Sequence, residues 1–370
     1  MQNGLKEIES LPPEDKDRLA VTGLDFSSMN RCGSFFQMDQ EILQSTCSYE
    51  GIEILPLGSA LERYSWLENY HWRLVSREKD EYTRYVAAQE EPKGYVIIAR
   101  KGSKNVLPLQ TCLFLAHRAV QHVHNIVIAE EGAELHLISG CASAAGMKEG
   151  AHYGVTEFFV GKNALISTTM IHNWGEEIEV YPRSGARVEE NGVFISNYIA
   201  MTPVKYVQMY PVADLVGENA VARFNSVVVA LPGSELDLGS AAILSAKGTS
   251  AELVSRAITR GGKVIARARI TGKKEETRGH IECKGLILED GCIHAIPEIE
   301  GRATGTELSH EAAVGKIARE EIEYLMARGL DEDEATATII RGFLDVKIEG
   351  LPDILQKQID AAIDASESGF

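Results

Sequence analysis

The sequence lacks the common short motifs of nucleotide binding and hydrolysis. It contains no Gly-x-x-x-x-Gly-Lys-Ser/Thr loop and no Gly-x-Gly-x-x-Gly after a strand-like run. The usual backbone cradles for nucleotide phosphates are therefore missing. Gly-x-Ser-x-Gly and His-Glu-x-x-His are also absent, which removes the two simplest hydrolase interpretations. Any dependence on ATP is expected to come from a separate subunit.

Targeting signals and an excess of positive charge are lacking as well. The first residues, MQNGLKEIESLPPEDKDRL, hold no basic stretch followed by an apolar core, and no later window approaches 18 apolar residues. The 37 basic and 54 acidic side chains give a formal charge of −17, which repels phosphate backbones and anionic lipids. We expect a cytoplasmic protein with neither nucleic acid nor membrane as a partner.

Six cysteines are scattered along the chain, and none belongs to a Cys-x-x-Cys pair of the kind found in zinc ribbons and ferredoxins. They stand at positions 32, 47, 112, 141, 283 and 292. Most free cysteines are small buried apolar residues. A functional thiol has to be singled out by its surroundings.

Three regions differ in pattern. Residues 1–92 are expected to be a mixed, partly helical region, with one helix opened by Pro12-Pro13-Glu14-Asp15 and another over residues 60–74. Residues 93–305 consist of short β-type runs such as YVIIA, NIVIA, ELHLI, TEFFV and KVIARARI, separated by glycine-containing turns. Residues 306–370 become helical again.

The turn glycines of the central region recur at intervals of roughly 15 or roughly 30 residues, which suggests a coil repeated every 15 or so residues. The pattern favours a mainly β protein built as a parallel β-helix, in which inward side chains stack from coil to coil. An antiparallel β-sandwich, whose turns also recur regularly, stays open as the alternative.

The C-terminal pattern predicts a small helical bundle. The first helix is expected from the N-cap Ser309 to Gly329, and the second from the capping-box pair Asp331 and Glu334 to Gly350. A third is expected to begin at Pro352. Such a bundle offers a compact surface for a partner protein.

Three places carry candidate chemistry. His122 and His124 are two apart on a predicted strand, hence on one face, which suits half of a metal site, although two histidines on a solvated face are the commoner case. Cys141 lies in SGCASAAG, where small neighbours favour an accessible thiol. Cys283 and the pair His310-Glu311 form a thiol, imidazole and carboxylate set suited to iron or zinc.

The order of motifs from about residue 95 onward resembles the SufB/SufD family. The segment CKGLILEDGCIHAIPEIEG, followed by SHEAAVGKIA and YLMARGL, resembles the C-terminal signature of these proteins. The block from IAEEGAELHLISGC to MIHNW resembles the central region of SufB. The resemblance covers roughly three quarters of the chain.

The resemblance implies a right-handed parallel β-helix with helical ends, acting as a scaffold and not as an enzyme. Its partners would be a SufC-type ABC ATPase bound by the C-terminal helices, a sulfur donor, and a second copy of the chain or a SufD-like paralogue. Its cargo would be a transient iron–sulfur cluster, either 4Fe-4S or 2Fe-2S.

Site residues follow from the same resemblance. Cys283 and Glu311, with His310 beside them, match the positions that hold the nascent cluster in SufB, and SufD lacks that cysteine. Cys141 matches the entry point for sulfur, which would travel inside the β-helix as persulfide. The other sulfur-transfer positions match His124, His152, His172, Trp174 and Arg183.

The match has departures. SufB has Arg near His124, Gln at His172 and Lys near Arg183, so the sulfur path of this chain is expected to be altered. The cysteine-rich N-terminal extension of many SufB proteins has no counterpart here, which fits systems with one scaffold and SufC alone. Two other functions stay open: a SufD-like structural or iron-entry partner, and a β-helix carbohydrate-active enzyme, which would need carboxylates along a groove.

Overall fold

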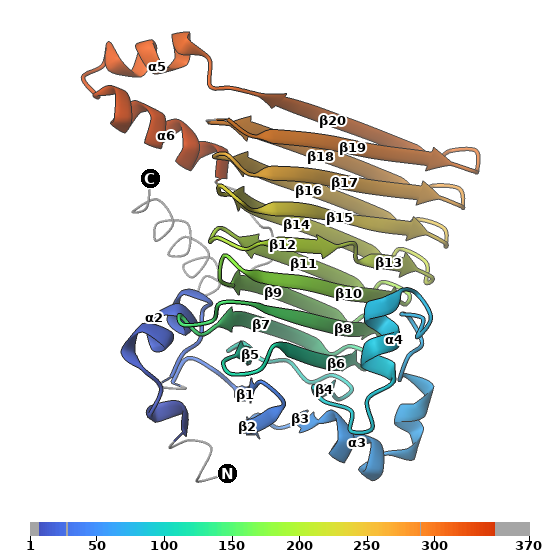
Figure 1. Ribbon diagram of the computed structural model, residues 1–370. Helices are drawn as coiled ribbons and strands as arrows, with labels where there is room; N and C mark the ends of the chain where they lie inside the picture. Colours follow the sequence, from blue (N-terminus) through green and yellow to red (C-terminus); the bar gives the residue numbers. More distant parts are fainter. Residues whose placement is uncertain (1–6, 27–28, 289, 345–370) are drawn as a thin grey trace.

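The computed structural model describes residues 7–26, 29–288 and 290–344, and the chain winds alternately through two long sheets that face each other (Figure 1). One sheet has the strand order β2-β1-β5-β7-β9-β11-β14-β16-β18-β20. The other has the order β19-β17-β15-β12-β10-β8-β6-β4-β3, with β13 pairing β10 and β15. Neighbouring strands are parallel except for the antiparallel pairs β1–β2 and β3–β4. The predicted mainly β architecture, a β-solenoid, is confirmed.

The strands are β1 (Gly33–Met38), β2 (Glu41–Cys47), β3 (Ile52–Pro56), β4 (Tyr95–Ala99), β5 (Leu109–Leu115), β6 (Val120–Ala129), β7 (Glu134–Ser143), β8 (Gly150–Val160), β9 (Leu165–Asn173), β10 (Ile178–Val188), β11 (Val193–Ala200), β12 (Tyr206–Met209), β13 (Val212–Leu215), β14 (Val221–Ala230), β15 (Glu235–Leu244), β16 (Ser250–Thr259), β17 (Lys263–Gly272), β18 (Arg278–Ile287), β19 (Cys292–Gly301) and β20 (Glu307–Gly315). The helices are α2 (Pro13–Val21), α3 (Leu57–Arg63), the 3-10 helix η1 (Ser65–Asn69), α4 (Glu81–Ala87), α5 (Arg319–Met326) and α6 (Glu332–Leu344).

Alternation of side chains along the strands builds one continuous interior. On β14, for example, Ala222, Phe224 and Val228 point into the main hydrophobic core, whereas Val227 and Val229 belong to a separate cluster on the outer face. Both faces of many strands are therefore buried. Helices and loops from the two ends of the chain cover parts of the outside.

Each full coil is about twice as long as the spacing expected from the sequence. Ser250 pairs with Arg278, 28 residues later, and Val120 pairs with Ala151, 31 residues later. The interval of roughly 15 residues is half a coil, which comprises one strand and one turn. In three turns an asparagine and not the nearby glycine takes the left-handed conformation, with φ of 55°, 52° and 59° at Asn163, Asn191 and Asn219.

The N-terminal region contains more strand than the sequence predicted. Helix α2 begins at Pro13 as expected. The helix expected over residues 60–74 is broken, because Tyr64 is extended between α3 and η1. Strand β1 pairs in parallel with β5, so the solenoid begins before residue 93.

The expected helix start at Ser309 is wrong, because β20 runs from Glu307 to Gly315 and pairs with β18 along its length. The solenoid therefore extends beyond residue 305, and the first C-terminal helix is α5. The capping box before α6 is confirmed: Glu334 N donates to Asp331 Oδ1 (2.8 Å) and Asp331 N donates to Glu334 Oε2 (3.1 Å). The helix expected at Pro352 lies outside the described residues.

Candidate functional site

Cys141 lies on the inner face of β7, in line with Leu135 and Leu137. Its side chain is inside the solenoid and the residue is only 2% exposed, so the accessible thiol expected from the sequence is wrong. Burial raises the pKa of the Cys141 thiol to about 12. At neutral pH the resting group is a protonated thiol, and a nearby base or a change in hydration is needed to form the thiolate.

Two histidines and a tryptophan surround this part of the interior. His172 is the register partner of Cys141 on the neighbouring strand β9. The Trp174 ring lies between the two imidazoles, with ring centroids 5.1 Å from His152 and 5.5 Å from His172. His172 Nδ1 is 3.0 Å from the hydroxyl of Tyr198 on β11. Cys141, His152, His172 and Trp174 are thus brought together, and we call them the inner cluster.

The hydrogen bonds of Gln121 fix the tautomer of His152. Gln121 Nε2 donates to the backbone oxygens of Asp39 and Phe114, at 3.0 and 3.1 Å. Its Oε1 therefore faces His152 Nδ1, 2.9 Å away, which must carry the proton. His152 Nε2 is left as a lone-pair acceptor.

The inner cluster is neutral at physiological pH. Burial lowers the pKa of both His152 and His172 to about 3. The buried Nε1–H of Trp174 has no hydrogen-bond partner among the described residues. A protonated thiol, a lone-pair acceptor and an unused donor therefore share one water-poor space, a combination that can take up a small polar sulfur species.

His124 and Arg183 lie on the outer face of their sheet and not with the inner cluster. His124 Nε2 is 2.8 Å from Glu157 Oε2, and Glu157 also accepts the backbone N–H of Trp72 at 2.7 Å. Arg183 Nε is 2.5 Å from Asp80 Oδ2. Both residues attach the N-terminal segment to the solenoid, because Asp80 is the N-cap of α4.

His122, the other member of the sequence pair, also faces outward. Its Nδ1 is 3.1 Å from the side-chain nitrogen of Gln40, and Tyr85 packs against its ring. His122 and His124 therefore share a face, as predicted. No metal-binding group of three or more His, Cys, Asp or Glu side chains is present in the part of the chain that the structure describes.

A column of inward side chains connects the neighbourhood of the inner cluster with Cys283. Tyr198 on β11 pairs with Ser226 on β14, Ser226 pairs with Ser255 on β16, and Ser255 pairs with Cys283 on β18. Three hydroxyl groups thus lead along the inner face of this sheet to the Cys283 thiol. We call these four residues the polar column.

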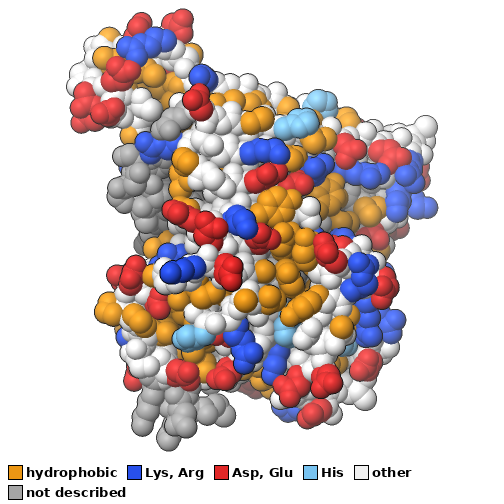
Figure 2. Space-filling model, in the orientation of Figure 1, with side chains coloured by type: hydrophobic (Ala, Val, Ile, Leu, Met, Phe, Trp, Pro, Cys, Tyr) orange, Lys and Arg blue, Asp and Glu red, His pale blue; other side chains and the backbone are white. Residues whose placement is uncertain are grey.

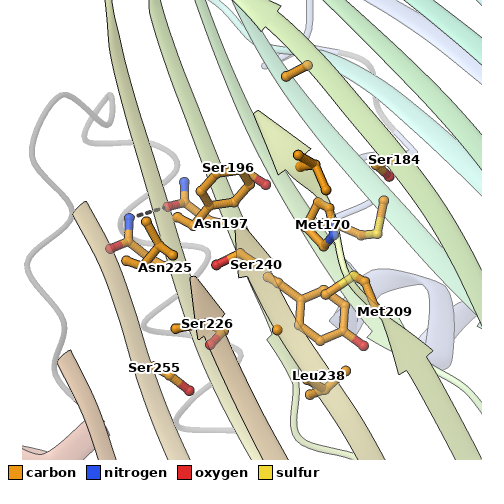
Figure 3. A pocket seen from close by; sticks show the side chains of 18 of the residues that line it. Met170, Ser184, Ser196, Asn197, Met209, Asn225, Ser226, Leu238, Ser240 and Ser255 are labelled. Atoms are coloured by element: carbon orange, nitrogen blue, oxygen red, sulfur yellow. Dashed lines mark hydrogen bonds between the residues drawn. The ribbon is translucent and has the colours of Figure 1, made fainter. Parts of the chain in front are cut away.

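A small cavity of about 60 Å³ lies beside this column (Figure 3). Methionines, serines and aromatic rings from both sheets line it, including Met170, Ser184, Ser196, Tyr198, Met209, Ser226, Ser240 and Ser255. Its wall reaches from Tyr198, which contacts His172, to Ser255, which adjoins Cys283. The cavity and the polar column therefore cover most of the way between the two thiols.

Cys283 is 2% exposed, and burial raises the pKa of its thiol to about 11. The next strand, β20, carries His310 and Glu311 at the open end of the solenoid (Figure 1). His310 pairs with the inward residue Ile281, whereas Glu311 pairs with the outward residue Glu282 and lies 3.4 Å from Lys284 Nζ. Within one chain the three expected ligands share neighbouring strands but do not converge on one point.

Tyr198, Ser226, Ser255 and Gln121 were not singled out from the sequence. The first three precede Cys283 in steps of 28 or 29 residues, which is the length of one coil. Counting back from Cys283 in such steps would have found the polar column, but only with the correct coil length. Gln121 has no comparable signal, because its role depends on where its neighbours' backbone oxygens lie.

Fold and interior together define a parallel β-solenoid protein with thiols and imidazoles inside. Residues 113–343 match the family described as SUF system FeS cluster assembly, SufBD core domain. The chain belongs to the SufBD family.

Relatives support this assignment. The chain is 49% identical over 354 residues to an iron-sulfur cluster assembly SufBD family protein of Archaeoglobus fulgidus, which covers 95% of each chain. It is 44% identical to a SufBD family protein of Methanothermobacter thermautotrophicus, over 98% of this chain and 90% of that one. It is 31% identical to iron-sulfur cluster assembly protein SufB of Bacillus subtilis, over 82% of this chain and 66% of that one. A carbohydrate-active enzyme finds no support in these matches.

Proposed function

We propose that this chain is a cytoplasmic scaffold subunit that accepts sulfur at Cys141 and iron at the open end of the solenoid, and assembles an iron–sulfur cluster there. The observation that carries the proposal is the polar column, which runs inside the solenoid from the Tyr198–His172 contact to Cys283. A purely structural solenoid has no need for hydroxyl groups stacked between two buried thiols. In its described residues no helix is long and apolar enough to cross a membrane.

Sulfur enters by exchange with a persulfide donor. The Cys141 thiolate attacks the outer sulfur of R–S–SH, the donor's S–S bond breaks, and R–S⁻ leaves as Cys141 becomes a persulfide. The proton of the thiol passes to the leaving thiolate, with the lone pair of His152 as its transient acceptor. The buried Trp174 N–H, which has no other partner among the described residues, would donate to the new terminal sulfur.

Transport from Cys141 to Cys283 crosses five strand spacings, from β7 through β9, β11, β14 and β16 to β18. At about 4.8 Å per spacing this is roughly 24 Å, far beyond the reach of one persulfide arm. Reduction of the persulfide by an external dithiol would restore the Cys141 thiol and free hydrosulfide. Hydrosulfide is small and accepts hydrogen bonds, so hydroxyl groups along its path favour its passage.

Assembly requires ligands from more than one chain. Cys283 supplies a thiolate, the preferred ligand of cluster iron, while His310 and Glu311 are weaker ligands that suit a cargo that must be released. His310 and Glu311 are exposed at the open end of the solenoid. A second copy or a SufD-like paralogue docked at this end would bring two sets together, and the cargo would be a 4Fe-4S or 2Fe-2S cluster.

ATP hydrolysis is assigned to a SufC-type ABC ATPase. The chain lacks a phosphate-binding loop, and no residue of α5 is buried, so this helix is free to bind a partner. The scaffold itself is proposed to have no enzymatic activity.

An anaerobic reconstitution with ferrous iron, run with two different sources of sulfur, distinguishes the roles of Cys141 and Cys283. With a persulfide donor, Cys141→Ser and Cys283→Ala should both lose cluster absorption and acid-labile sulfide. With free sulfide, Cys141→Ser should recover the cluster, because the entry step is bypassed, and Cys283→Ala should not. Cys292→Ser is the matched control, since Cys292 is exposed on β19. Wild-type cluster content in Cys283→Ala under both conditions would instead favour a SufD-like structural or iron-entry partner.

A further inference from the structure

Two cysteines outside the sulfur path lie together at the end of the solenoid where the chain begins. Cys32 directly precedes β1, and Cys47 is the last residue of β2, the edge strand of its sheet (Figure 1). The register pairs Cys47 with Gly33, the residue next to Cys32. The antiparallel pairing of β1 with β2 therefore brings the two cysteines close together, although they are fifteen residues apart in the sequence.

The absence of a side chain at Gly33 allows this approach. A Cβ atom at Gly33 would lie 2.8 Å from the Thr46 carbonyl oxygen and 3.0 Å from Cys47 Cβ, closer than such atoms tolerate. Cys47 Sγ lies 3.5 Å from the Cys32 carbonyl oxygen, and the two thiols are close enough to shift each other's pKa. Neither cysteine is part of a disulfide.

The two thiols differ in exposure and in polarity. Cys32 is 5% exposed and belongs to the main core, whereas Cys47 is half-buried. The hydrogen bond from Cys32 lowers the pKa of Cys47 to about 7, and the same hydrogen bond, together with burial, raises the pKa of Cys32. The side-chain nitrogen of Asn105 lies 3.7 Å from the Cys32 sulfur and holds it in place. One thiol is therefore reachable and partly ionised near neutral pH, and the other is protected behind it.

We propose that Cys47 and Cys32 form a redox-active dithiol that exchanges with low-molecular-weight disulfides, Cys47 as the attacking thiol and Cys32 as the resolving one. The Cys47 thiolate attacks one sulfur of R–S–S–R, whose S–S bond breaks, and R–S⁻ leaves. Cys32, as its thiolate, then attacks Cys47 Sγ, releases the second R–S⁻ and closes the Cys32–Cys47 disulfide. The two protons go to the leaving thiolates, so both cysteines are oxidised while one external disulfide is reduced to two thiols.

This site is independent of the proposed sulfur path. The dithiol lies at the start of β1 and the end of β2, at the opposite end of the sheet from β20 with its proposed cluster ligands. Closing the disulfide would covalently tie the start of β1 to the end of β2, the edge strand. The oxidised chain would thus have a fixed first coil, and the reduced chain would rely on backbone pairing alone.

The test uses the full reduced chain and glutathione disulfide as the probe. Samples are quenched over time with an alkylating agent and the cysteine peptides are mapped by mass spectrometry. The expected end product is a Cys32–Cys47 crosslink, formed several-fold faster than glutathione adds to the exposed Cys292, because the lowered pKa of Cys47 increases its thiolate fraction. Cys32→Ser should accumulate a stable glutathione adduct on Cys47, and Cys47→Ser should leave Cys32 unmodified.

Each other result would overturn the proposal. Glutathione that stays on Cys47 in the wild-type chain would show that Cys32 does not resolve it. Modification confined to Cys292, or no modification, would show that Cys47 is not reactive. Circular dichroism before the reaction confirms that the serine variants fold, and if one does not, the wild-type time course alone decides between these outcomes.

Discussion

Ser255 and Cys283 are register partners on β16 and β18, so the buried thiol follows directly after the last serine of the cavity wall. The spacing between such partners is about one strand separation, 4.8 Å. The side chains alternate strictly, and a shift of one residue would move either group to the outer face. The contact is therefore fixed by the register of the whole sheet and not by local hydrogen bonds.

A larger side chain in the polar column should slow the arrival of sulfur at Cys283 without affecting its entry at Cys141. Ser226→Leu places an apolar side chain between Tyr198 and Ser255. Overpacking of this kind costs about 1–3 kcal/mol of stability. With an isotope-labelled persulfide donor, an added dithiol and ferrous iron, label should still load on Cys141 as persulfide but appear much more slowly as acid-labile sulfide of the cluster. Mass spectrometry of the Cys141 peptide measures entry, and the labelled sulfide released by acid measures arrival.

Ser226→Ala is the control for this experiment, because it removes the hydroxyl without narrowing the cavity. Equal arrival of label at Cys283 in Ser226→Leu and wild type would mean that sulfur does not use this interior route. A loss in both variants would mean that the hydroxyl, and not the open space, is what matters.

The histidines of the inner cluster should make the protein sensitive to acid. Burial lowers the pKa of His172 from 6.5 to about 3. Between pH 6.5 and 3 the imidazole of His172 is therefore protonated in the unfolded chain and neutral in the folded one. The free energy of unfolding that this residue contributes is fully present above pH 6.5 and is lost as the pH falls toward 3. The effect is on the order of 4 to 5 kcal/mol for one such group at the lower limit. Urea unfolding at several pH values should show a shallower loss in His172→Gln.

His294 provides the comparison, since its side chain is exposed on β19. His294→Gln should keep the full acid dependence of the wild type. An unchanged pH profile in His172→Gln would contradict the burial of an uncharged imidazole at this position.

The sequence predicted the class of fold because the alternating runs and turn residues are local signals. The coil length was misjudged for a physical reason: both half-coils have the same strand-turn pattern, and only register distinguishes them. The strand Glu307–Gly315 was misread as helix because its side chains are largely exposed at the open end, so it has no alternation of apolar and polar residues. Apolar residues of α5 such as Ile322 and Leu325 lay close enough to suggest a single long helix.

Residue roles were predicted less completely than the fold. Cys141, His152, His172 and Trp174 meet inside the solenoid, whereas His124 and Arg183 do not, although all six came from one resemblance. Side chains that are one position apart in register point to opposite faces of a strand. The sequence does not indicate which of the two faces is covered by a distant segment of the chain. Here the covering segment is residues 72–87, held by Glu157 and by Arg183.

Arg183 should therefore stabilise the fold and leave sulfur loading unaffected. Besides its contact with Asp80, Arg183 donates to the carbonyl oxygen of Gln208 at 2.7 Å and to its side-chain oxygen at 2.8 Å. Arg183→Ala removes the donor to these partly buried acceptors, which costs about 1 kcal/mol per group. The midpoint of urea unfolding should fall, while persulfide labelling of Cys141 at low temperature should stay at the wild-type level.

Arg187→Ala, at an exposed position on the same strand, serves as the control. Loss of labelling without loss of stability would place Arg183 in the sulfur path after all.

The last prediction concerns the surface for the ATPase. Helix α6 is fixed to the solenoid, since Ile340 and Leu344 are buried against outer-face residues such as Ile258 and Leu286. Helix α5 is not, and acidic side chains gather on the projecting helices (Figure 2). Its Tyr324 is 57% exposed.

An exposed aromatic side chain on a helix that makes no buried contact is suited to be a binding anchor. Tyr324→Ala should weaken the association with a SufC-type ATPase by about 2 kcal/mol if it is such an anchor, with little change in unfolding, because the side chain is largely exposed and its ring contacts the guanidinium of Arg328. Deleting the chain from residue 306, the start of the helical region expected from the sequence, would be a poor test of this surface, since it also removes strand β20 from the sheet. Isothermal titration of the purified ATPase with wild-type chain, Tyr324→Ala and the exposed control Tyr85→Ala, which lies on α4, gives the comparison. Equal affinity in all three would move the partner surface away from α5.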